Sequence, residues 1–258
     1  MSSDASRTVA VRRQTRRRTP PARERYHHGD LRRALIDAAL TLTIKQGPGT
    51  YTLADLCRVV GVSPAAPYRH FESLNQVTAE AALEGFALLD ERTARSFRGA
   101  DWQARLASCV GDFLGFVRAH PAHAVMMFST RAQTVVEPDF NPLAPLDLPQ
   151  ARNATEAAVY DGWRAGYASF GRFAQGMAQA LAGSPLAPAL ATRERALETA
   201  LALFTIMYGI AAQWLDRALP DDWLDRDGRK TFRKIVLPWA LGTAQLCATK
   251  ASAHRRSG

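Results

Sequence analysis

Apolar residues recur every three to four positions along nearly the whole chain after residue 29, and this spacing constrains the fold most strongly. It places the apolar residues of each segment on one face of a helix. No segment shows the apolar–polar alternation of a strand. The pattern therefore predicts an all-α fold. In the first segment, which we expect to begin after an N-cap at Asp30, the apolar face comprises Leu31, Leu35, Ala38, Ala39 and Leu42.

Helix-capping residues divide the next part of the chain. Gly47-Pro48-Gly49 is expected to end the first helix, and Thr52 to cap the second, with Asp55 in its first turn. Gly61 can adopt the left-handed conformation that ends a helix. Ser63 is then expected to cap a third, short helix with Pro64 at its first position.

Longer helices are expected to follow. Ser73 and Gln76 form a capping box for a helix that runs to about Arg98. The four prolines between Val136 and Pro149 predict a loop or extended segment, and Pro238 predicts a kink or restart. Further helical patterns cover 102–119, 121–131, 150–182, 190–219 and 229–249.

The formal net charge of +9 lies on the two ends of the chain. Residues 1–25 hold eight arginines and two carboxylates, and residues 250–258 add three basic residues, so the remainder is neutral. A basic arm of this kind favours a polyanionic partner, most simply nucleic acid. A solvated, disordered leader with no specific role remains the alternative.

The other sequence features restrict the compartment and the chemistry. Three cysteines without paired spacing fit a reducing compartment, so we expect a cytoplasmic protein. The amino end lacks an apolar leader, and Thr199–Leu215 is too short and polar for a membrane span. His120 and His123 lack a third ligand at a convincing spacing, and no hydrolase or phosphate-loop motif occurs. We therefore expect no catalytic residue, metal, cofactor or membrane partner.

The segment from Thr52 to Phe71 predicts a helix-turn-helix that binds double-stranded DNA. Small residues let the second helix approach base edges, and hydroxyls at helix N-termini favour phosphates. Phe71 would fix this second helix to the helices that precede it. Taken singly, Tyr68 is equally well explained as an aromatic residue at the edge of the core, and a histidine such as His70 is more often structural than a contact. The small residues are Ser63, Ala65 and Ala66, and the donors that follow are Tyr68, Arg69 and His70.

These residues resemble the tetracycline-repressor-like (TetR) transcription regulators. The resemblance covers about 26–90 and includes Tyr-His-His-Gly-Asp-Leu-Arg at 26–32, the Gly-Val-Ser turn and Tyr-Arg-His-Phe at 68–71. It implies phosphate contacts from Thr52, Ser63, Tyr68 and His70, and groove contacts from Ala65, Ala66 and Arg69. We also assign Arg25 and His28 to the DNA-binding set.

Two positions depart from the family pattern. Leu74 stands where the family usually has a phosphate-binding lysine, so Asn75 or the Arg-rich arm is expected to replace that contact. The opening motif and residues 63–71 resemble a branch that usually has Trp-His-Gly in its carboxy-terminal domain. This chain reads Met207-Tyr208-Gly209 there, which puts a shared ligand chemistry in doubt.

The family resemblance implies a small-molecule effector pocket in the larger helical part. Aromatic residues at helical spacing are candidates for its lining, although periodicity alone favours plain core packing. Because most of these candidates are aromatic, we expect a hydrophobic or planar effector. The candidates are Phe113, Phe116, Met127, Tyr160, Trp163, Tyr167, Phe170 and Tyr208.

The last two long helices are apolar over much of their circumference, which suggests a second packing partner. The resemblance implies that they pair with their copies in a homodimer. Ordinary core packing within one chain is the alternative. The candidate interface residues are Leu197, Leu201, Phe204, Leu215, Phe232, Ile235, Trp239 and Leu246.

We therefore expect a ligand-responsive regulator, a repressor by default, that binds a palindromic operator as a homodimer. A ligand-binding dimer with lost or weak DNA binding, or an activator of the same fold, remains the alternative. The expected parts are a disordered arm (1–25), a DNA-binding head (26–88), a ligand-binding and dimerisation domain (89–250) and a disordered basic tail (251–258).

Overall fold

The computed structural model describes residues 28–128, 146–215 and 229–254, with side chains described for 31–128, 146–215 and 229–245. Every regular element in these ranges is helical, which confirms the all-α prediction. In chain order the elements are α1 (His28–Gln46), α2 (Leu53–Val60), the 3₁₀ turn η1 (Pro67–Arg69), α3 (Leu74–Thr93), α4 (Trp102–Ala119), α5 (Pro121–Phe128), α6 (Ala154–Leu181), η3 (Ala187–Leu190), α7 (Arg193–Leu215), α8 (Arg229–Thr231), the π-helical turn η5 (Phe232–Val236) and α9 (Leu237–His254).

The head consists of α1, α2 and η1. All five residues of the predicted apolar face of α1 are buried, and Leu56 of α2 packs with them. Phe71, which follows η1, is buried as predicted, and the Arg32 guanidinium carbon lies 4.6 Å from the centre of its ring. These buried residues of the head, Phe71 included, are continuous with those of the larger helical part in one apolar core.

The predicted caps of α2 are confirmed. The Thr52 hydroxyl accepts from the Asp55 N–H (3.3 Å), and an Asp55 carboxylate oxygen accepts from the Thr52 N–H (2.8 Å), so the two residues form a capping box. Gly61 has φ +79° and its N–H donates to the Cys57 carbonyl at 2.8 Å. These local bonds fix where α2 begins and ends.

Several predicted boundaries are wrong. α1 begins at His28, before Asp30, and α3 ends at Thr93, because the chain turns through Phe97 with φ +64°. α6 begins four residues late, at Ala154, after Asn153 caps it by accepting from the Glu156 N–H (2.8 Å). α9 continues to His254, so residues 251–254 are helical rather than part of a disordered tail.

Pro238 interrupts the last helix as predicted. Proline has no N–H to donate, so the α-helical ladder cannot pass through it unchanged. The chain responds with η5, in which the Leu237 N–H donates to the Phe232 carbonyl five residues earlier, and α9 restarts at Leu237.

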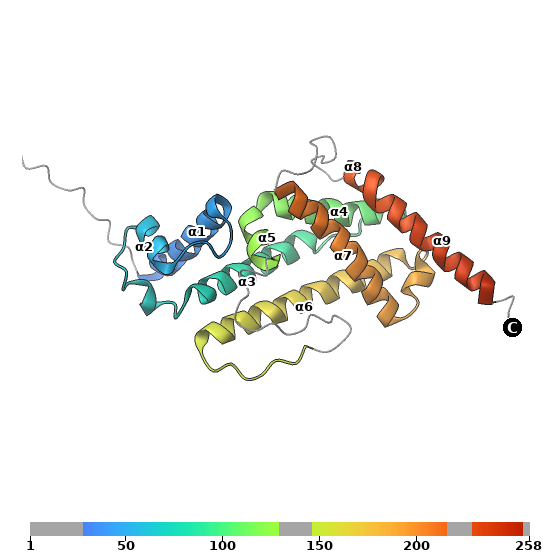
Figure 1. The fold of residues 1–258 in the computed structure, drawn as a ribbon. Coiled ribbons are helices and arrows are strands. Elements are labelled where there is room, and N and C mark those ends of the chain that lie inside the picture. Colours follow the sequence, from blue (N-terminus) through green and yellow to red (C-terminus); the bar gives the residue numbers. More distant parts are fainter. Residues whose placement is uncertain (1–27, 129–145, 216–228, 255–258) are drawn as a thin grey trace, which may run out of the picture.

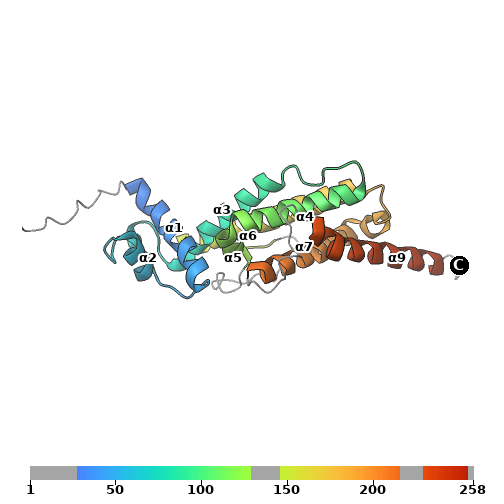
Figure 2. The ribbon, with the colours of Figure 1, turned by 90° about the horizontal axis from the view of Figure 1, so that it is seen from above.

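The molecule is elongated, with the head at one end and the tip of α9 at the other (Figures 1 and 2). α3 runs from the head into the larger helical part, here called the body, and packs along α6. α4, α5 and α7 cover this pair. α9 extends beyond the body in both views.

Two glycines of α6 allow it to pack closely against neighbouring aromatic rings. A Cβ at Gly166 would lie 3.0 Å from the Phe86 ring of α3, and one at Gly176 would lie 3.1 Å from the Phe97 ring. Both distances are shorter than ordinary van der Waals contact between carbon atoms. The position of α6 therefore depends on glycine, which has no side chain, at these two positions.

Among the described residues, α7 is long and apolar enough to cross a membrane by length and composition. Ala200, Leu203 and Met207 along one side of it are buried within the protein. This burial agrees with the prediction of a core helix in this part of the chain.

We predict that Gly61→Ala lowers the free energy of unfolding by about 1–2 kcal/mol, because an L-residue must adopt the left-handed conformation there. A Cβ at Gly61 meets no atom within 4 Å, so the cost is conformational. Gly171→Ala is the matched control: its surroundings are equally open, but it lies within α6 and should stabilise by about 0.5–1 kcal/mol. Urea unfolding followed by circular dichroism measures both, and equal effects of the two substitutions would contradict this account.

Candidate nucleic-acid interface and ligand cavity

The segment after the Gly61 turn is shorter and tighter than predicted. The Ala66 N–H donates to the Ser63 carbonyl (3.0 Å) and the His70 N–H to the Pro67 carbonyl (2.8 Å), both with three-residue spacing. The α-helix predicted to begin at Ser63 is therefore wrong, and the 3₁₀ turn η1 begins at Pro67 instead. Pro67 lacks the N–H that would donate to Ser63 in an α-helix, so the α-helical ladder does not start.

This recognition segment, residues 62–71, presents most of the predicted contact residues to solvent. Ser63, Ala65 and Arg69 are exposed, and Tyr68 has 65% of its surface exposed. Pro67 and Phe71 are the buried residues that hold the segment to the head, while Ala66 is half-buried. An aromatic side chain as open as Tyr68 is available to a partner, and the interpretation of Tyr68 as a core-edge residue is wrong.

His70 is placed less favourably for a phosphate contact. Its side chain is half-buried, and its Nε2 is closed off from solvent without a hydrogen-bond partner. Its carbonyl accepts from Arg32 Nη1 at 2.8 Å. In this arrangement His70 contributes to the join between the recognition segment and α1, and Nε2 does not face outward.

The surroundings of Thr52 also differ from those of a simple phosphate-binding site, because a negative charge lies beside its hydroxyl. Hydrogen bonds from the Thr52 hydroxyl (2.7 Å) and backbone N–H, together with Arg58 (2.6 Å), lower the pKa of Asp55 to about 2. Thr52 is exposed, but its hydroxyl proton is already directed to this ionised carboxylate. Exposed Arg58 offsets the negative charge on the outer side of α2.

The remaining predicted DNA contacts lie at the edges of this surface. Leu74 is half-buried against the apolar core, and Asn75 is half-buried beside it in the first turn of α3. Arg25 lies outside the described residues, and the side chain of His28 lies outside the described side chains. Val59 of α2, 53% exposed, is an apolar surface residue that the sequence patterns did not single out.

The body contains a cavity of about 440 Å³ between α3, α4, α5, α6 and α7. Five of the eight predicted residues line it. Four further aromatic residues in the lining were missed, because they lie on α3, in the turn after it, at the far end of α6 and on α7. The predicted residues that line the cavity are Phe113, Met127, Trp163, Tyr167 and Phe170, the missed ones are Phe86, Phe97, Phe173 and Phe204, and Phe128 of α5 completes the aromatic lining.

Three predicted cavity residues lie elsewhere. Phe116 is fully buried in the core and its ring packs on His120, with 5.6 Å between centres. Tyr160 is buried in a small separate cluster with Val159. The Tyr208 hydroxyl donates to the Phe128 carbonyl at 3.4 Å, and its ring stacks on Phe204. Their assignment to the cavity lining is therefore wrong.

The cavity has one polar corner, which sequence reasoning also missed. The Ser169 hydroxyl donates to Asp90 Oδ1 at 2.8 Å, and Arg172 forms an ion pair with Asp90 Oδ2. All three residues line the cavity, two from α6 and one from α3. Because Asp90 and Arg172 neutralise one another, the corner offers hydrogen-bonding groups without net charge.

The predicted dimer residues divide into three groups. Phe232 is buried within its own chain, which argues against its assignment to an interface, whereas Phe204 is half-buried and lines the cavity. The side chain of Leu246 is outside the described side chains. The half-buried residues on α7 and in the η5–α9 segment are Leu197, Leu201, Leu215, Ile235 and Trp239.

Comparison with known proteins gives a fold and no function. No protein-family model and no curated protein matches the chain. A solved structure described as a protein with unknown function from Rhodococcus sp. RHA1 is similar over 86% of this chain and 97% of its own, with 25% identity and a TM-score of 0.54. The two share an overall fold.

Two solved regulators are similar at lower scores. One is a bacterial regulatory protein in the tetR family from Rhodococcus RHA1, with 20% identity over 73% of this chain and 94% of its own and a TM-score of 0.42. The other is a member of the TetR transcriptional regulator family from Streptomyces coelicolor A3, with 14% identity over 83% of this chain and 88% of its own and a TM-score of 0.45.

We predict that the cavity binds an uncharged aromatic dye, N-phenyl-1-naphthylamine, and that Gly162→Leu weakens this binding about tenfold or more. Gly162 lines the cavity, and the nearest atom to an added Cβ is 4.0 Å away, so a leucine side chain can start there without a clash and occupy part of the cavity. Gly171→Leu, on the same helix but not in the lining, should leave the affinity unchanged. Dye fluorescence titrations measure both, and equal losses in the two variants would contradict this location.

Proposed function

We propose that this chain is a ligand-responsive transcription regulator of the tetracycline-repressor type that binds double-stranded operator DNA through its head. The supporting observation is the recognition segment, fixed at Pro67 and Phe71 while Tyr68 and Arg69 stay exposed. A tyrosine hydroxyl and a guanidinium are donors for phosphate oxygens and base edges. Arg69 is the proposed base-reading residue, and Tyr68 and Ser63 are proposed phosphate contacts.

The proposed effector is a small, uncharged, ring-containing molecule that occupies the body cavity. Nine aromatic side chains surround this space, which favours planar apolar groups. An ion that entered would lose its water without meeting a net opposite charge, because Asp90 and Arg172 are already paired. The Ser169 oxygen can still accept a hydrogen bond and the remaining Arg172 N–H groups can donate, which suits a single hydroxyl at one end of the molecule.

The proposed assembly is a homodimer formed through α7 and α9. α9 extends past the body in both views, and Leu241 on it is 48% exposed. Half-buried Ile235 and Trp239, four residues apart, lie on another side of the same segment, so apolar side chains are open to a partner there as well. Two heads in one dimer suit a palindromic site. Repression in the cytoplasm is the proposed mode and place of action.

A ligand-binding dimer with weak DNA binding is the second candidate. Two observations favour it: the recognition segment is a single 3₁₀ turn, and Leu74 packs inward where the family pattern has a phosphate-binding lysine. A mobility-shift titration of the wild type on its own upstream DNA, with unrelated duplex as competitor, separates the two candidates.

We predict that Arg69→Ala weakens specific DNA binding by about 1–3 kcal/mol, because one base contact is lost. Tyr68→Ala should weaken binding to specific and unrelated duplexes alike, as expected for a phosphate contact. Arg164→Ala removes an exposed arginine on α6, far from the recognition segment, and should change the affinity less than twofold. Footprinting and mobility shifts on the intergenic DNA provide the measurements. Full binding by Arg69→Ala would remove the proposed reading role.

We predict that deleting residues 1–24, which hold seven arginines, lowers DNA affinity and flattens its dependence on salt. Each phosphate neutralised contributes about −0.9 to the slope of log K against log salt. A leader of equal length with these arginines changed to serine should behave like the deletion, because charge and not length matters. Binding titrations between low and moderate salt measure the slope, and an unchanged slope would exclude this role for the arm.

A further inference from the structure

A contact between residues far apart in the chain joins the recognition segment to the cavity helix. Glu72 directly follows Phe71, and its Oε2 accepts from the backbone N–H of Thr155 (3.0 Å) and from the Thr155 hydroxyl (3.3 Å). The neighbouring Ser73 hydroxyl lies 2.8 Å from the Thr155 hydroxyl. Thr155 is the second residue of α6, and it is buried. We call this the Glu72–Thr155 contact.

The contact suits the electrostatics of a helix start. The first N–H groups of a helix have no partner within it, and the helix dipole favours a negative charge there. Asn153 accepts one of these donors, from Glu156 (2.8 Å), and Glu72 accepts the donor of Thr155. The start of α6 is therefore completed by a residue that belongs to the head.

The backbone of Glu72 begins a second series of hydrogen bonds, which leads through α3 and α1 to the end of the recognition segment. Its backbone N–H donates to Gln76 Oε1 (2.8 Å), and Gln76 Nε2 donates to Glu80 (3.1 Å). Glu80 pairs with Arg32, which lies over the Phe71 ring and donates to the His70 carbonyl. A displacement at Glu72 thus acts on the bonds that hold residues 70 and 71.

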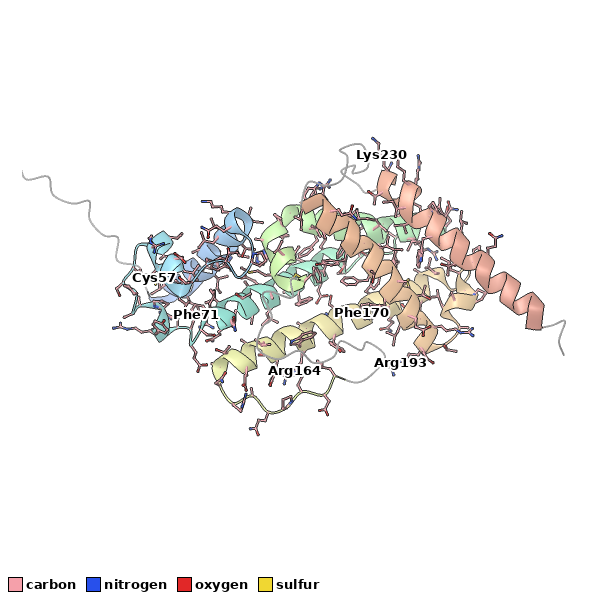
Figure 3. The ribbon with its side chains drawn as sticks, in the orientation of Figure 1. Cys57, Phe71, Arg164, Phe170, Arg193 and Lys230 are labelled. Atoms are coloured by element: carbon pink, nitrogen blue, oxygen red, sulfur yellow. The ribbon has the colours of Figure 1, made fainter. Side chains whose placement is uncertain are left out.

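The same helix forms one wall of the cavity. Trp163, Tyr167 and Phe170 of α6 line it, two to four turns beyond Thr155. In Figure 3, Phe71 lies in the head and Phe170, a residue of α6, lies in the body. α6 therefore spans the distance between the two regions. An occupant that shifts α6 moves Thr155 with it.

We propose that Glu72 is a positioning residue that couples the cavity helix to the recognition segment, so that movement of α6 resets Tyr68 and Arg69 relative to DNA. The proposal rests on the proposed function for its ligand and its DNA. α3 joins the same two regions through the continuous chain. Removal of the Glu72 carboxylate leaves that route intact and isolates the contribution of the contact.

Hydrogen–deuterium exchange of the full-length protein tests the coupling without any ligand. Glu72→Ala should accelerate exchange about tenfold, both in residues 154–160 and in residues 61–73, because a charge-assisted hydrogen bond is lost. Glu72→Gln keeps an acceptor without the charge and should give a smaller change in both segments. Glu91→Ala, an exposed carboxylate further along α3, should change neither.

Faster exchange in 154–160 alone would reduce Glu72 to a cap of α6 and overturn the proposal, as would no change in either segment. If Glu72→Ala fails to fold, Glu72→Gln decides by the same comparison of the two segments.

A second arm adds saturating N-phenyl-1-naphthylamine. The dye should change exchange in residues 61–73 of the wild type and of Glu91→Ala, and this change should be lost in Glu72→Ala. An equal change in Glu72→Ala would assign the coupling to α3 and overturn the proposal. Failure of the dye to bind, or of the wild type to bind any duplex, would contradict the proposed function, while the ligand-free exchange comparison still decides the role of Glu72.

Discussion

The close packing of α3 along α6 is the constraint on which the rest of the structure depends. α3 begins at the recognition segment and α6 forms a wall of the cavity, so their contact fixes the head and the body in one frame. Gly166 permits the approach of Phe86, and the Asp90 bonds to Ser169 and Arg172 tie the same two helices further along. Side-chain volume and one ion pair together set the distance between them.

Local hydrogen-bond chemistry explains how much of the head could be predicted from the sequence. The Thr52–Asp55 box and the left-handed Gly61 involve residues at most four apart, so their chemistry is legible in the sequence. The end of α3 and the backbone turn at Phe97 depend on packing against distant rings, and no local pattern indicates them. The helix predicted to begin at Ser63 does not form, because the N–H group missing at Pro67 prevents a short helix from starting.

The cavity was only partly predictable for a related reason. Helical spacing identifies an aromatic face, and it does not say which element lies opposite. Trp163, Tyr167 and Phe170 face the cavity, whereas Tyr160 on the same helix is buried in a separate cluster. The polar corner and the Glu72–Thr155 contact join residues about 80 positions apart, so only the tertiary structure brings them together.

Pro67 also affects how the recognition segment can change during evolution. Any other amino acid at that position would supply the missing N–H, so a single codon change could convert the 3₁₀ turn into a longer helix with different side-chain directions. Such a change would remove the buried Pro67 ring, while Phe71 would remain as the buried anchor of the segment. One mutational step at this position would therefore reshape the exposed recognition segment while Phe71 still holds its end to the head.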